Sequence, residues 1–180
     1  TRQILIDVIN GLLFLHNRKI IHHDIKLENF IVGKDGKVKI SDFGNATILK
    51  EKKCYVTCGT LAYMSPELII DDGINGHGFE VDVWAVGVSA FLMLNGRLPF
   101  IGNDKDEIEE KIKNCIYSFD DESSISKNAK DFIEKIFQID PKKRPSLIEL
   151  IEHPFLSKID KKKINFLNTS KSHSDCDKCC

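Results

Sequence analysis

The hydrophobic positions at the start of the chain predict an amphipathic helix over residues 1–18. Its apolar side chains recur three or four residues apart, which is the spacing of one face of an α-helix. A two-residue strand is expected next, at Ile20 and Ile21. The residues at 22–29 are mostly polar, so this segment is expected to form a loop.

Two short apolar runs after this loop predict a β-hairpin. The expected strands are 30–32 and 37–40, and the four residues between them read Gly-Lys-Asp-Gly. Glycine-rich connections of this length favour a tight turn. The following segment, 41–64, has little periodicity, and irregular stretches of that length are usually functional or disordered.

The second half of the chain has helical patterns. Residues 80–95 are apolar nearly all round, so this helix is expected inside the core, and Gly96 suits its C-terminal cap. Two further helices are expected over roughly 104–115 and 126–138. A capping-box pattern at 146–149 indicates the start of a last helix.

Composition narrows the classes of function. We assign residues 1–157 to one domain and residues 158–180, rich in Lys, Ser and Cys, to a polar tail predicted to be disordered. The net charge of −1 does not indicate a nucleic-acid partner. The longest apolar run, 83–94, is too short to span a bilayer. The three widely spaced cysteines of the domain do not suggest disulfides, which favours a cytoplasmic or nuclear, intracellular location.

The polar loop holds an acid, a base and an amide within six residues, at Asp24, Lys26 and Asn29. Asp42 follows Asn29 by thirteen residues, and the predicted hairpin between them sends the chain out and back. We therefore expect Asp24, Asn29 and Asp42 to converge. Two carboxylates and an amide suit Mg²⁺, a hard ion that prefers oxygen ligands, with phosphate supplying the remaining ones.

These segments resemble the motifs of a eukaryotic protein kinase. Residues 22–29 read His-His-Asp-Ile-Lys-Leu-Glu-Asn, similar to the catalytic loop H-R-D-L-K-x-x-N, and residues 42–44 match D-F-G. Later landmarks follow in the family's order to about residue 156: Tyr63-Met64-Ser65-Pro66-Glu67, Asp82-Val83-Trp84-Ala85-Val86-Gly87, Leu98-Pro99-Phe100 and Arg144-Pro145. Lys26 is typical of serine/threonine kinases, and residues 100–104 are most similar to the calcium/calmodulin-dependent group.

The resemblance implies a mainly α fold with small β-hairpins, namely the large C-terminal lobe of a protein kinase without the N-terminal lobe. Nothing in the chain resembles the Gly-rich loop, the strand lysine or the helix glutamate of the small lobe. We therefore expect the natural protein to continue upstream of Thr1. Alone, the chain is expected to bind ATP poorly and to expose apolar surface at Ile31 and Phe43, where a small lobe or a partner chain belongs.

The resemblance also implies roles for individual residues. Asp24 would accept or orient the proton of the substrate hydroxyl, and Lys26 would neutralise charge on the transferred phosphoryl group. Asn29 and Asp42 would hold the Mg²⁺ that accompanies ATP. Ile31 would lie beneath the adenine ring.

The implied function is transfer of the γ-phosphoryl group of ATP to protein Ser or Thr hydroxyls. Thr60 would hydrogen-bond beside Asp24 and Lys26 and support the peptide, and Glu28 would attract a basic residue of the protein substrate. The alternative is a catalytically inactive, truncated kinase that serves as a binding or regulatory module. The intact catalytic set favours the first, whereas the lack of small-lobe motifs favours the second.

Other matched residues are expected to be structural. His22 is expected to be a packed, hydrogen-bonded histidine. Asp82, a carboxylate within an apolar helix, should accept backbone N–H bonds from residues 22–23, because an unpaired buried charge is costly. Glu67 and Arg144 should form a buried ion pair.

The sequence departs from the family pattern at His23, which replaces the H-R-D arginine that receives an activation-loop phosphate in many kinases. Counting back from Thr60, the usual phosphosite is Val56, which cannot be phosphorylated. We therefore expect that this chain is not switched by that phosphate, although Thr57 and Tyr55 could still be modified.

The tail contains His173, Cys176, Cys179 and Cys180. The H-x-x-C-x-x-C spacing is a half-site for zinc, and terminal cysteines are also sites of lipidation. The alternative is a disordered tail with incidental thiols.

Overall fold

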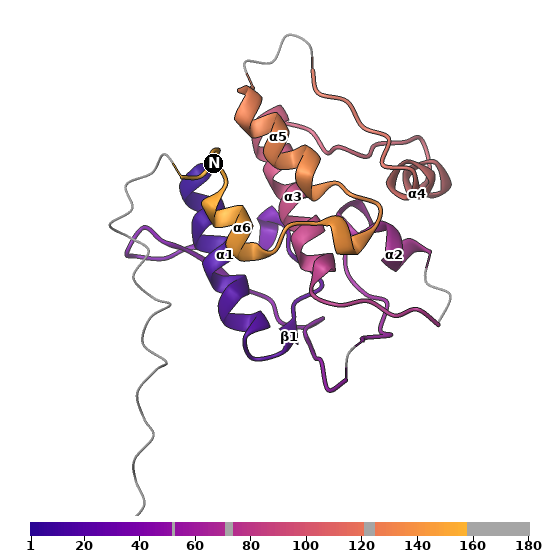
Figure 1. Ribbon diagram of the computed structural model, residues 1–180, viewed down its shortest axis with the longest axis horizontal. Coiled ribbons are helices and arrows are strands. Elements are labelled where there is room, and N and C mark those ends of the chain that lie inside the picture. Colours follow the sequence, from indigo (N-terminus) through magenta and orange to yellow (C-terminus); the bar gives the residue numbers. More distant parts are fainter. Residues whose placement is uncertain (52, 71–73, 121–124, 158–180) are drawn as a thin grey trace, which may run out of the picture.

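A central helix, α3 (Glu80–Asn95), organises the fold. The computed structural model describes residues 1–51, 53–70, 74–120 and 125–157. Helices α1 (Arg2–His16) and α6 (Leu147–Glu152) lie side by side on one flank of α3, and α5 (Lys127–Ile136) packs on another (Figure 1). Because α3 is surrounded by apolar neighbours, eleven of its residues are buried. Its observed bounds are those predicted, and Gly96 caps it with a left-handed φ of 71°.

The outer helices follow the predicted amphipathic patterns. Helix α1 buries the side of the chain that carries Leu5, Val8, Ile9, Leu12 and Leu15. The face of α5 that carries Ala129, Phe132, Ile133 and Ile136 is buried as well. Helix α4 (Lys105–Lys113) begins at Asp104, whose side chain accepts the N–H of Glu107, and α6 begins with the predicted capping box at Ser146.

Two small antiparallel sheets lie beside the helices. Strand β2 (Phe30–Val32) pairs with β3 (Val38–Ile40), which confirms the predicted hairpin. Strand β1 (Ile20–Ile21), also predicted, pairs with β4 (Thr47–Ile48). Strand β4 lies within residues 41–64, the segment whose sequence has little periodicity. Its strand geometry comes from pairing with the distant strand β1 and not from a local sequence pattern.

Short helical turns complete the described chain. Helix α2 spans Pro66–Ile69, with proline in its first turn. Single 3₁₀ turns lie at Leu27–Asn29, Leu61–Tyr63 and Pro141–Lys143. Both the expected tail and its His/Cys motif lie outside the described residues.

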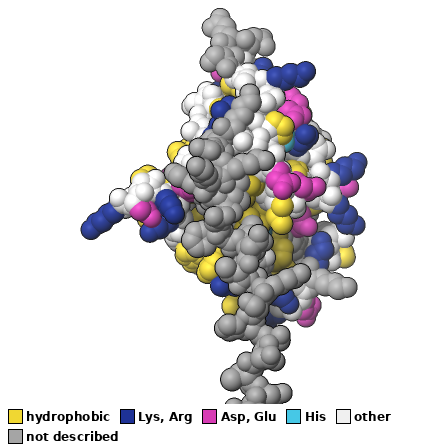
Figure 2. Space-filling view, turned by 60° about the vertical axis from the view of Figure 1, so that its left-hand side comes forward, with side chains coloured by type: hydrophobic (Ala, Val, Ile, Leu, Met, Phe, Trp, Pro, Cys, Tyr) yellow, Lys and Arg dark blue, Asp and Glu magenta, His cyan; other side chains and the backbone are white. Residues whose placement is uncertain are grey.

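An aromatic cluster fills the interior beneath α3. Trp84 is fully buried and stacks on Phe100 with ring centroids 5.6 Å apart, and Phe137 lies 4.8 Å from the same indole. Among the described residues, no helix is both long and apolar enough to cross a membrane. Basic and acidic side chains are interspersed on the face shown in Figure 2, as the near-zero net charge suggests.

Candidate active site

A closed set of hydrogen bonds joins the predicted catalytic residues. Thr60 Oγ1 donates to Asp24 Oδ1 at 2.7 Å and accepts from Lys26 Nζ at 2.8 Å. Lys26 Nζ also pairs with Asp24 Oδ2 at 2.9 Å. The three side chains therefore form a triangle in which each polar group is held by the other two. Asp24 and Lys26 come from the polar loop, and Thr60 arrives from a segment 36 residues further on.

Asn29 holds the same loop from the other side. Its Nδ2 donates to the backbone oxygen of Asp24 at 2.8 Å and to Asp24 Oδ2 at 3.3 Å. Asn29 is buried, and a buried amide that satisfies both a backbone and a side-chain acceptor restrains the loop. Because Nδ2 faces Asp24, the amide Oδ1 is left as the oxygen ligand that this residue offers.

The carboxylate of Asp24 is ionised in this setting. Burial of the side chain raises its pKa, but the hydrogen bonds from Lys26 and Thr60, with the charge of Lys26, outweigh burial and bring the pKa below its ordinary value. A carboxylate with a lowered pKa is a weak base. The geometry is therefore better suited to orienting a substrate hydroxyl than to removing its proton before phosphoryl transfer begins.

Asp42 is brought to this loop through its neighbour Ser41. Both the backbone N–H and the hydroxyl of Ser41 donate to the Asn29 carbonyl, at 2.9 and 3.0 Å. Asp42 adopts a left-handed φ of 60°, and its Oδ1 accepts the N–H of Gly44 at 3.2 Å. Its carboxylate is exposed, as a ligand for a solvated ion must be.

The residues expected to hold Mg²⁺ fit that ion by the chemistry of their donors. Asn29 offers an amide oxygen and Asp42 an exposed carboxylate, and hard divalent cations prefer such oxygen ligands. Magnesium is usually bound by one or two protein ligands and by substrate phosphates, which matches this small donor set.

A buried carboxylate of α3 anchors the polar loop from below. Asp82 is fully buried and accepts the backbone N–H groups of His22 and His23, each at 2.9 Å, as the sequence predicted. It also accepts from His16 Nε2 at 2.8 Å, a bond that was not anticipated. Burial raises the pKa of Asp82, but the His16 contact and the two N–H bonds together lower it by more than burial raises it. The net shift of the pKa is therefore downward.

His22 has the structural role expected of it. It is fully buried, its Nδ1 accepts the N–H of Asp24 at 3.3 Å, and its Nε2 lies 3.2 Å from the Ser41 carbonyl. Since Nδ1 accepts, Nε2 carries the hydrogen and donates to that carbonyl. The imidazole thereby ties the segment before Asp42 to Asp24, the first residue of the hydrogen-bonded triangle.

Glu67 and Arg144 form the predicted ion pair, with two parallel bonds of 2.6 and 2.7 Å. The Arg144 side chain is wholly buried and also donates to the carbonyls of Gln138 and Glu80. A bidentate pair of this kind fixes position as well as charge. It fastens α2 to the segment before α6.

The residues expected to meet ATP and peptide lie on the surface. Ile31 is 55% exposed and Phe43 is 50% exposed, which agrees with the apolar surface predicted there. Glu28 is exposed, and its carboxylate interacts with the hydroxyl of Tyr63, raising the Tyr63 pKa after burial has already done so, to about 12. The negative charge of Glu28 therefore lies at the surface beside Tyr63, which follows Thr60 by three residues.

A cluster near the loop was missed by sequence reasoning. His23, Cys54 and His77 are all buried and meet through their side chains. The sequence signal was weak, because Cys54 lies in the aperiodic segment and His77 between two glycines. In the sequence, His23 is distinguished only by replacing the arginine that the family pattern predicts there.

Comparison with known proteins agrees with this geometry. Residues 1–156 match the protein kinase domain family, so the chain belongs to the protein kinases. It is 43% identical over 153 residues to a probable serine/threonine-protein kinase CCRP1 of Zea mays, covering 84% of this chain and 24% of that protein. It is 37% identical over 176 residues to the serine/threonine-protein kinase PLK4 of Drosophila grimshawi, covering 96% and 22%. The cell cycle serine/threonine-protein kinase CDC5/MSD2 of Saccharomyces cerevisiae is 36% identical over 149 residues, with 82% and 21% covered.

These comparisons support the serine/threonine class and leave finer predictions open. The chain spans less than a quarter of the length of each of these three relatives. The expected likeness of residues 100–104 to the calcium/calmodulin-dependent group has no specific support among them and stays a prediction.

Proposed function

We propose that this chain is the catalytic C-terminal lobe of a serine/threonine protein kinase that transfers the γ-phosphoryl group of ATP to protein hydroxyls. The observation that carries this proposal is the hydrogen-bonded triangle of Asp24, Lys26 and Thr60. Asp24 accepts the hydrogen bond of the incoming hydroxyl and sets its direction, because its ionised carboxylate is held rigidly. Lys26 offers positive charge where the transferred group carries negative charge.

Asn29 and Asp42 are the residues proposed to hold Mg²⁺. Magnesium with ATP, when bound, supplies the phosphoryl group and neutralises its charge. The chain's own contribution is to keep the two ligands close to Asp24, through the Asn29 amide and through the Ser41 bonds to the Asn29 carbonyl. Ile31 is proposed to lie against the adenine ring.

The exposed apolar side chains are proposed to be covered in the working enzyme. These side chains are Ile31 and Val32 of β2 and Phe43, three residues after the end of β3, and each is at least half exposed. Exposed apolar surface of this kind marks a binding site or an interface. A kinase small lobe, or a partner chain in its place, would cover these side chains and complete the ATP site. Glu28 is proposed to attract a basic residue of the peptide substrate.

The test is phosphoryl transfer from radiolabelled ATP to a Ser-containing basic peptide, with the longest natural polypeptide that contains residues 1–180. Asp24→Asn should abolish transfer and leave the fold intact, because it keeps the shape of the side chain and removes its charge. Asp120→Asn, a change to an exposed aspartate paired with Arg97, serves as the control and should retain activity. Undiminished transfer by Asp24→Asn would refute the role of that residue. Peptide binding without any transfer by the parent protein would favour a non-catalytic binding module.

A further inference from the structure

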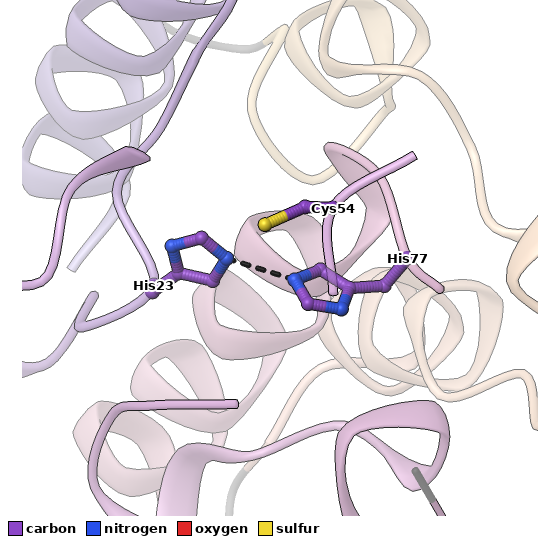
Figure 3. A group of neighbouring side chains, drawn as sticks. All are labelled: His23, Cys54 and His77. Atoms are coloured by element: carbon purple, nitrogen blue, oxygen red, sulfur yellow. Dashed lines mark hydrogen bonds between the residues drawn. The ribbon is translucent and has the colours of Figure 1, made fainter. Parts of the chain in front are cut away.

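Three buried side chains from three separate segments converge behind the catalytic loop. His23 precedes Asp24, Cys54 lies in the segment between Asp42 and Thr60, and His77 lies shortly before α3. One ligand atom from each lies within 4.8 Å of the others, and their exposed fractions are only 5 to 7%. Figure 3 shows the Cys54 sulfur pointing toward the gap between the two imidazoles.

The backbone holds two of these residues as a pair. Cys54 and His77 form an isolated antiparallel bridge, with reciprocal N–H···O bonds of 2.8 Å. Gly76 makes this approach possible, because a Cβ there would lie 2.9 Å from the Cys54 carbonyl oxygen, and its φ is +55°. The thiol and one imidazole are therefore placed by main-chain bonds before any ligand arrives.

His23 is oriented independently of that bridge. Its N–H donates to Asp82 and its Nδ1 lies 3.1 Å from the Asn45 carbonyl. Because a carbonyl only accepts, Nδ1 carries the hydrogen and Nε2 is left as the electron-pair donor. A carbonyl on the far nitrogen is the usual orienting partner of a metal-binding histidine. Gly59 admits this arrangement, since a Cβ there would meet the His23 oxygen at 2.4 Å.

We propose that His23, Cys54 and His77 form a zinc site that fastens the segment around Cys54 to the catalytic loop. Two imidazole nitrogens and one thiolate are ligands that Zn²⁺ accepts, with a water molecule in the fourth position. Tetrahedral zinc places two such nitrogens about 3.4 Å apart and nitrogen and sulfur about 3.6 Å apart. The two Nε2 atoms are 2.8 Å apart, so they need to separate by about 0.6 Å to reach that spacing.

Metal binding exchanges one set of contacts for another. The hydrogen bond between the two Nε2 atoms breaks. His77 Nε2, the donor in that bond, gives up its proton to solvent and Nδ1 of the same ring takes one up, so that both Nε2 atoms can donate electron pairs to Zn²⁺. The thiol of Cys54 loses its proton to solvent, as thiolate ligation requires. Of the three ligands, His77 also lines a surface pocket, together with Gly76. Any effect on phosphoryl transfer rests on the proposed function, whereas the binding itself does not.

The experiment uses the full 180-residue chain with Cys176→Ser, Cys179→Ser and Cys180→Ser, so that tail thiols do not compete. Zn²⁺ affinity is measured by competition with a chromophoric chelator, and Co²⁺ is added as a spectroscopic probe. We expect one ion per chain, a thiolate-to-cobalt charge-transfer band and the intense visible bands of tetrahedral cobalt. Zn²⁺ should also raise the temperature of unfolding, because its three ligands meet only in the folded chain.

Single variants assign the ligands. Cys54→Ser should remove the charge-transfer band, and both Cys54→Ser and His77→Ala should weaken Zn²⁺ binding by at least about 100-fold, the upper end of the loss seen when only a supporting residue is removed. The matched controls are Cys115→Ser and His153→Ala, since His153 is buried to 6% exposure, close to the 5% of His77. Both controls should bind as the parent does.

Three outcomes would overturn the proposal. One is a parent chain that binds no Zn²⁺ at one equivalent and shows no rise in unfolding temperature, a result that does not depend on the folding of any variant. Another is unchanged affinity in folded Cys54→Ser and His77→Ala, with circular dichroism as the check on folding. The last is tight binding of Cu²⁺ without binding of Zn²⁺, because histidine and cysteine ligands also suit copper.

Discussion

Loss of the negative charge of Glu67, the partner of Arg144, is predicted to lower the free energy of unfolding far more than loss of a surface charge. Glu67→Gln keeps the size of the side chain but leaves the guanidinium, whose side chain is 0% exposed, without its counter-charge. The carbonyls of Gln138 and Glu80 still accept from it, so hydrogen bonds remain while the charge is uncompensated. Breaking a buried pair from one side costs about 3–5 kcal/mol in the free energy of unfolding.

The assay is urea unfolding of the 180-residue chain, followed by fluorescence. The chain has a single tryptophan, Trp84, and the Arg144 guanidinium lies 4.9 Å from its ring, so the probe reports on this region directly. The control is Asp120→Asn, which breaks a pair with Arg97 whose side chains are 32% and 50% exposed. Exposed pairs are worth about 0–1 kcal/mol.

A double variant separates the ion pair from the packing around it. Glu67→Leu with Arg144→Met removes both charges, and apolar replacements of a buried pair are often neutral or stabilising. We therefore expect the double variant to be more stable than either single one. A loss in the free energy of unfolding below about 1 kcal/mol for Glu67→Gln, similar to that for Asp120→Asn, would refute the reasoning. It would show that burial does not make the loss of this charge more destabilising.

Two further predictions concern α3. Gly87→Ala should destabilise the chain by about 1–3 kcal/mol in urea unfolding, because the added Cβ would lie 2.5 Å from Ile136 Cγ2, and this clash outweighs a gain of about 1 kcal/mol in helix propensity; a stabilised variant would contradict it. The pKa of Asp82 is lowered on folding, so its carboxylate contributes stability above the unfolded pKa of about 3.9, and that stability is lost as the pH falls through the lower folded value. Unfolding measured at descending pH should lose stability more steeply in the parent than in Asp82→Asn, and parallel curves would rule this out.

The elements that the sequence predicted well are those whose signal is local. The bounds of α3 agree because its apolar residues run without interruption and Gly96 ends them. The capping box at Ser146 and the hairpin of β2 and β3 likewise depend on neighbouring residues. Strand β4 was not predicted, because its two residues acquire strand geometry only by pairing with β1.

In the candidate site, too, the residues that lie close together in the sequence were predicted, and the contacts between distant segments were not. Asp24, Lys26 and Asn29 lie within one loop, so their convergence could be read from spacing, and Thr60 was added by resemblance. The bond from His16 to Asp82 joins residues 66 positions apart, and a helix-terminal histidine gives no sign of its partner. The cluster of His23, Cys54 and His77 likewise forms only when three separate segments pack together. No local sequence motif therefore indicates it.

The carboxylate of Asp82 has a consequence for how the polar loop at residues 22–29 moves. The fully buried Asp82 side chain of α3 accepts hydrogen bonds from the backbone N–H groups of His22 and His23 in the loop and from His16 at the end of α1. The loop cannot open by itself without stranding that charge, so it shares the cooperative unit of the helical core rather than breathing separately. Amide hydrogens of His22 and His23 should then exchange with solvent as slowly as those of the innermost helix, unlike ordinary loop amides.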